Sequence, residues 1–152
     1  HEHCGSYGAK RLQEWQDQPR EDIGQYDIID RQRVGVFDYV AGNLDRHDEN
    51  YVSDATGRPA AIDNGLCLPD SYLDPIKSVF FESILDQPLN QGLVQSLRSV
   101  DEVRLTSDLS ACGVTDAAVS GVLSRLHEAQ SGYIDGRSWL GGIQDGMFNV
   151  IR

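Results

Sequence analysis

The most reactive residue types in this sequence gather in one short stretch, "DRHDEN", which covers residues 45–50. The stretch combines carboxylates, a guanidinium, an imidazole and an amide. A further aspartate, Asp63, follows two short apolar runs. Carboxylate and amide oxygens suit Mg²⁺, and a carboxylate can also take a proton from a hydroxyl group. These residue types predict metal-assisted or acid–base chemistry, provided that the fold brings them together.

The residues between Asn50 and Asp63 indicate how the fold could do so. Tyr51–Val52 and Ala60–Ile62 are apolar runs, and the segment between them, "SDATGRP", is rich in turn-forming residues. This pattern predicts a β-hairpin, and paired strands lie about 4.8 Å apart. We therefore expect Asn50 and Asp63 to be neighbours that bind Mg²⁺. Asp45 would lie beside them, orient a hydroxyl group and accept its proton. Taken singly, the same residues are also explained as ordinary turns.

Taken in order, "DRHDEN" and the later "AIDNG" (residues 61–65) resemble the catalytic loop and metal-binding turn of the phosphatidylinositol 3/4-kinases. They are most similar to type II phosphatidylinositol 4-kinases and their bacterial relatives. The Asp-x4-Asn spacing is also similar to the catalytic loop of protein kinases. The resemblance covers about residues 29–69. It implies an α+β, mostly helical fold, the C-lobe of a protein-kinase-like domain, which uses ATP and Mg²⁺.

The resemblance also implies roles for individual residues. Asp45 matches the catalytic aspartate, and Asn50 and Asp63 match the ligands of the Mg²⁺ that accompanies ATP. Arg46 and His47 match the Arg-His pair of the lipid-kinase loop, which implies a catalytic part for both. An imidazole beside the γ-phosphate can act as a base or as a hydrogen-bond donor.

Helices are expected before and after this stretch. Apolar spacing predicts a helix over residues 26–41 that ends at Gly42 or Asn43, directly before the loop. Later helices are expected over 76–86 and 89–98, with two more inside 106–131 that meet at Gly113 and are capped by Thr106 and by Thr115 or Asp116. Residues 1–22 are interpreted as an arm or linker and residues 23–152 as the C-lobe.

Composition excludes several classes of protein. The chain has 152 residues and no apolar run long enough to span a membrane. Its three scattered cysteines predict reduced thiols and a cytoplasmic location. The net charge of −11 disfavours nucleic acids and anionic membranes as partners. The helices within 106–131 have the spacing of a helix-turn-helix, but the second carries only Arg125 as a cation, so core helices are expected instead.

The sequence contains no recognisable lobe to grip ATP. There is no Gly-rich phosphate loop, and neither Lys10 nor Lys77 lies in a strand pattern upstream of the expected catalytic helix. Three explanations stay open: a fragment of a longer kinase, an N-lobe on a partner protein, or a reduced and inactive relative. The leading hypothesis is a phosphotransferase that moves the γ-phosphate of ATP to a hydroxyl of a lipid, a protein or a small molecule. The alternative is a non-catalytic, pseudokinase-like interaction or regulatory domain.

Overall fold

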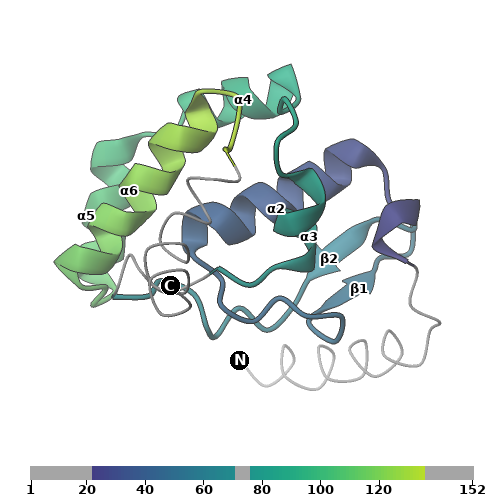
Figure 1. The fold of residues 1–152 in the computed structure, drawn as a ribbon. Coiled ribbons are helices and arrows are strands. Elements are labelled where there is room, and N and C mark those ends of the chain that lie inside the picture. The colour runs from purple at the N-terminus through teal and green to yellow at the C-terminus, as the bar shows by residue number, and fades with distance from the viewer. Residues whose placement is uncertain (1–21, 71–75, 136–152) are drawn as a thin grey trace, which may run out of the picture.

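A computed structural model describes residues 22–70 and 76–135 of the protein and shows an α+β fold in which helices predominate. The long helix α2 (Ile28–Ala41) runs through the middle, with the two-stranded sheet on one side (Figure 1). Helices α5 (Glu102–Ala111) and α6 (Asp116–Gln130) lie on the other side. This architecture is compatible with the expected C-lobe. Most of the expected arm, including Lys10, lies outside the described residues.

Helix α2 confirms the helix expected over 26–41, with its first turn two residues later. Asp27 is the N-cap, and its carboxylate accepts a hydrogen bond of 2.8 Å from the Ile29 N–H. Tyr26 therefore precedes the helix and packs in a small aromatic cluster instead. Gly42 ends the helix in the left-handed conformation, with φ of 70°, so the chain turns sharply into the loop.

The expected hairpin is also present. Strand β1 (Tyr51–Ser53) pairs antiparallel with β2 (Pro59–Ala61), and Tyr51 lies opposite Ala61. The pairing continues one residue further, because the Ile62 N–H donates to the Asn50 carbonyl at 3.0 Å. The pairing between the two arms of the hairpin therefore extends to Asn50 on one arm and to Ile62, directly before Asp63, on the other.

The helix expected over 76–86 is shorter than predicted. Helix α3 covers only Val79–Ile84, and the Ser78 hydroxyl caps it by accepting from the Phe81 N–H. Ile76 and Lys77 are extended, since the Lys77 backbone bonds to the loop that follows α2. Pairing with a distant segment has overridden the local helical pattern here.

The C-terminal helices follow the sequence pattern closely, with one error. Helix α4 (Gln91–Arg98) is capped by Asn90, and α6 (Asp116–Gln130) is capped by Thr115 as expected. Helix α5 covers Glu102–Ala111 and is capped by Asp101, so the prediction of a start at Thr106 was wrong. Asp and Thr are both favourable caps, and the first turn forms at the earlier one.

The core joins these elements around α2. The rings of Tyr39 and Phe81 stack at a centroid distance of 4.7 Å, and α4 and α6 contribute Val94 and Ala129 to the same cluster. Helix α6 contacts α2, α4 and α5, as expected of a core helix. Arg125 is buried and donates to the Val40 carbonyl at 3.2 Å, so it is directed into the protein. In the part of the chain that is described, no helix is both long and apolar enough to cross a bilayer.

Candidate functional site

The polar loop between α2 and β1 is anchored at its start by buried side-chain bonds. Asn43 is 1% exposed, and its amide nitrogen donates to the Asp38 carboxylate at 3.2 Å. Its amide oxygen accepts from the Asp45 N–H at 2.9 Å, and the Leu44 N–H donates to the Leu66 carbonyl. The loop is therefore held both to α2 and to the segment after the hairpin, and the position of Asp45 is set from both sides.

Asp45 and Asn50 are joined directly. The Asn50 amide nitrogen donates to the Asp45 carbonyl at 2.6 Å and lies 3.4 Å from its carboxylate. A carbonyl oxygen can only accept, so the amide nitrogen must face Asp45 and the amide oxygen must face elsewhere. Asn50 is 7% exposed, while the Asp45 side chain is 45% exposed. The structure thus pairs an exposed carboxylate with an oriented amide oxygen.

Asp63 follows the last paired residue of the hairpin. The bond between Ile62 and Asn50 places Asp63 one residue beyond Asn50's partner, in an exposed position. Its φ of 50° lies in the left-handed region, which is strained for a residue other than glycine. Its carboxylate accepts from the Gly65 N–H at 3.4 Å. The hairpin therefore brings the Asp63 segment beside Asn50, as the sequence predicted.

These oxygens suit a hard cation. Across residues 22–70 and 76–135, no group of three or more His, Cys, Asp and Glu residues could hold a metal ion. An ion here would instead use the Asn50 amide oxygen and the Asp63 carboxylate, with water and substrate oxygens completing its shell. Such a mixed shell is typical of Mg²⁺. The donor set therefore fits the predicted ion.

Arg46 lies in the interior. Its side chain is 0% exposed and forms an ion pair with Asp38 at 3.0 Å. The guanidinium also donates to the Asn50 carbonyl at 2.7 Å, to the Ile62 carbonyl and to the Asn64 side chain. One side chain thus joins α2, the loop and the end of the hairpin. The sequence predicted Arg46 as a site residue, but it did not predict that Arg46 connects these three segments.

Asp38 is the site residue that sequence reasoning missed. Its carboxylate is 0% exposed and accepts bonds from Arg46, Asn43 and the Ser78 hydroxyl, the last at 2.6 Å. These bonds compensate for the removal of a charge from water. The signal was an aspartate between Phe37 and Tyr39, close to the apolar stripe of a helix, where a charge requires a partner.

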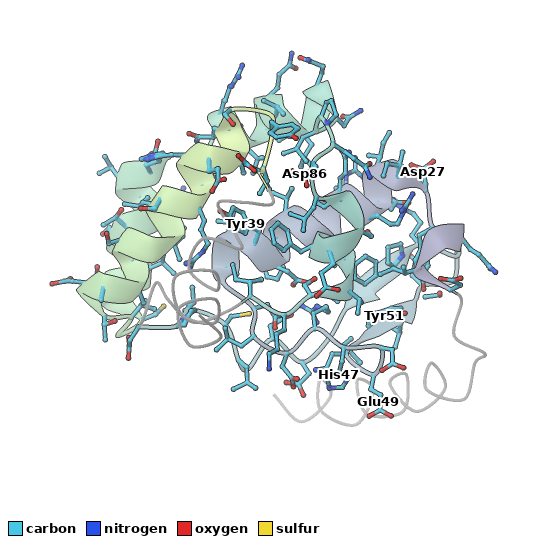
Figure 2. The ribbon with its side chains drawn as sticks, in the orientation of Figure 1. Asp27, Tyr39, His47, Glu49, Tyr51 and Asp86 are labelled. Atoms are coloured by element: carbon cyan, nitrogen blue, oxygen red, sulfur yellow. The ribbon has the colours of Figure 1, made fainter. Side chains whose placement is uncertain are left out.

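His47 lies at the exposed surface of the loop, where Figure 2 shows it and Glu49 directed away from the helices. Its Nδ1 accepts from the Glu49 N–H at 3.1 Å. In a neutral imidazole the proton is then on Nε2, which lies 3.6 Å from the Asp45 carboxylate. The ring therefore directs an N–H towards Asp45 and the solvent beside it.

Cys67 follows the turn of Asp63 but is not poised to react. Burial raises the pKa of its thiol, the negative charge of Asp38 raises it further, and Arg46 opposes the change. A thiol with a raised pKa is a poor nucleophile because little thiolate is present.

Comparison with known proteins identifies the class. Residues 9–104, more than half of the chain, match the phosphatidylinositol 3- and 4-kinase family, and the match includes the loop, the hairpin and α3. The chain belongs to this family of kinase-like phosphotransferases. No curated protein and no solved structure gave a significant match.

Proposed function

We propose that the protein transfers the γ-phosphate of ATP to a hydroxyl group in a Mg²⁺-dependent reaction. Asn50 and Asp63 would hold Mg²⁺, which when bound neutralises phosphate charge. The observation that carries this proposal is the bond between the Asn50 amide and the Asp45 carbonyl, because it directs the amide nitrogen to Asp45 and leaves the amide oxygen as a possible metal ligand. Membership of the family supports the reaction class.

In this proposal the other residues of the loop have separate functions. Asp45 orients the acceptor hydroxyl and takes its proton, and its exposure of 45% leaves the carboxylate accessible. His47 donates its Nε2 proton towards the phosphate beside Asp45. Arg46 is a positioning residue, because its buried guanidinium fixes the backbone on both sides of the site.

We also propose which class of molecule accepts the phosphate. The "DRHDEN" and "AIDNG" stretches favour a relative of the type II phosphatidylinositol 4-kinases and of similar bacterial proteins. A net charge of −11 makes approach to an anionic membrane unfavourable, so we place a protein or small-molecule hydroxyl before a lipid. A vesicle-binding assay at low salt tests this order, and tight binding to anionic vesicles would reverse it.

One observation favours a second candidate, a non-catalytic domain that binds a protein partner. The sheet in the described residues has two strands, and a kinase N-lobe that grips ATP is a larger sheet. Nucleotide binding would then be absent or would depend on another polypeptide segment.

Thermal unfolding with and without Mg²⁺-ATP separates the two candidates. We expect Mg²⁺-ATP to raise the Tm of the protein, since a ligand that binds only the folded state stabilises it. The shift should disappear in Asn50→Ala and Asp63→Asn. Asp108→Asn, which removes the same charge from the exposed surface of α5, should keep it. An unchanged Tm in the wild type would favour the non-catalytic domain.

A further inference from the structure

Residues 76–78 run beside the loop that holds Asp45 and pair with it through backbone hydrogen bonds and one isolated β-bridge. The Arg46 N–H donates to the Lys77 carbonyl at 2.8 Å, and the Lys77 N–H donates to the Asn43 carbonyl at 3.0 Å. Arg46 and Ser78 are paired in a parallel bridge. A segment distant in sequence therefore lies one strand spacing, about 4.8 Å, from the loop.

The pairing determines where the side chains point. Arg46 and Ser78 both turn inward and bind Asp38. Side chains alternate along an extended segment, so Lys77 must turn outward, and it is exposed. The Lys77 backbone bonds to Asn43 and to Arg46, so two loop residues, Leu44 and Asp45, lie opposite the single residue Lys77. This is the arrangement of a β-bulge, in which one strand carries one extra residue. The backbones of Lys77 and Asp45 therefore lie at the same edge of the site, and both side chains are accessible there.

The charges around this edge make Lys77 distinctive. Within residues 43–50, 62–66 and 76–78, the lysine and arginine side chains are those of Arg46, which is buried, and Lys77, which is exposed. In the described part of the chain, Lys77 forms no ion pair. The exposed acidic groups in these segments are the carboxylates of Asp48, Glu49 and Asp63, beside the exposed imidazole of His47. A triphosphate that approaches these carboxylates needs a nearby cation as well as the metal.

We infer that Lys77 is a further catalytic residue, whose ammonium group contacts the peripheral oxygens of the transferring phosphoryl group. The inference rests on the proposed function. In the reaction the acceptor oxygen bonds to the γ-phosphorus, and the bond from phosphorus to the β–γ bridging oxygen breaks. The electron pair leaves with ADP, and the acceptor proton passes to Asp45. Lys77 stays protonated and donates N–H bonds to oxygens that carry the negative charge.

Comparison of ATP and ADP affinity tests this assignment, because only ATP carries the γ-phosphate. Titration calorimetry with each nucleotide in Mg²⁺ would compare the wild type with Lys77→Ala. We expect the variant to bind ATP about tenfold more weakly, the loss of one charge-assisted bond, and to bind ADP within about twofold of the wild type. Lys77→Arg should recover part of the ATP affinity. Arg104→Ala, on the exposed surface of α5, makes the same charge change far along the chain and should alter neither affinity.

The outcomes separate this inference from the proposal beneath it. If the wild type binds both nucleotides and Lys77→Ala loses nothing, or loses equal affinity for both, then Lys77 does not contact the γ-phosphate and the proposed function stands. If the wild type binds neither nucleotide, the proposed function fails and the inference fails with it. Because the Lys77 side chain is exposed, the variant should unfold at the temperature of the wild type, which is measured alongside.

Discussion

Two adjacent residues of α2 face two regions that are built by different means. Asp38 turns to the polar loop between α2 and β1 and is enclosed by an arginine, an asparagine and a serine. Tyr39 stacks on Phe81 within the large apolar cluster, and its hydroxyl reaches Glu128 on α6. The loop region is therefore held by directional polar bonds, and the helical region mainly by apolar packing.

The difference concerns precision as well as stability. Apolar burial is non-directional and depends on area, so it stabilises a fold without placing single atoms. Charged hydrogen bonds have narrow geometry and orient the groups they join. The guanidinium of Arg46 bonds to the carbonyls of Asn50 and Ile62 together, so it sets the relation between the loop and the end of the hairpin. We expect damage to the loop region to disturb site geometry, and damage to the helical region away from α3 to disturb stability alone.

The largest effect should follow from Asp38→Ala. This change leaves Arg46 as an uncompensated buried charge, a defect that costs about 3–5 kcal/mol of unfolding free energy. Urea denaturation measures the loss, and hydrogen exchange of residues 43–50 should rise selectively. The double variant Asp38→Ala with Arg46→Met should cost less than the sum of the two single changes. Additive costs would contradict the buried pair.

A slightly smaller loss is expected from Leu126→Ala in α6. Leu126 is 2% exposed, and truncation of a buried leucine costs about 2–5 kcal/mol. Hydrogen exchange of residues 43–50 should keep its wild-type pattern, apart from the change in global stability. Selectively faster hydrogen exchange of the loop in this variant would contradict the distinction between the two regions.

Gly35→Ala tests the contact between α2 and α3. A methyl group at Gly35 would lie 3.0 Å from the Phe80 carbonyl oxygen and 2.8 Å from the Ile84 side chain, so the backbone of α3 must shift. Overpacking of this kind costs about 1–3 kcal/mol. Because Ser78 caps α3 and binds Asp38, we also expect weaker Mg²⁺-ATP binding, measured by calorimetry. Unchanged affinity would show that the shift does not reach the site.

The smallest effect is expected in the hairpin turn, at low pH. A hydrogen bond from the Thr56 hydroxyl, followed by one from the Arg58 N–H, holds the pKa of Asp54 below its ordinary value of 3.8. A lowered pKa stabilises the fold fully above pH 3.8, and this contribution is lost as the pH falls through the folded value. Thr56→Ala should therefore destabilise the protein slightly at pH 7 and less at pH 3, by urea denaturation. In an Asp54→Asn background the pH dependence of this effect should vanish.

Local rules predicted the elements whose partners are close in sequence. Helix α2, the hairpin and α6 follow from periodicity and from turn or cap residues, and Gly42 ended α2 as expected. The extended conformation of Lys77 could not be predicted in this way, because its hydrogen bonds are to Asn43 and Arg46. The start of α5 was predicted wrongly for a different reason. Asp101 and Thr106 are both favourable N-cap residues, and they lie five residues apart.

The sequence by itself determined the arrangement of the candidate site: a loop that contains Asp45 and Asn50, and a hairpin that returns Asp63 to it. These relations are short in sequence, so local propensity is enough to establish them. Only the tertiary structure decided that Arg46 lies in the interior and Lys77 at the surface. Burial depends on which distant groups can satisfy a charge, and the Asp38 carboxylate that satisfies Arg46 reaches it only once α2, the loop and α3 have packed together.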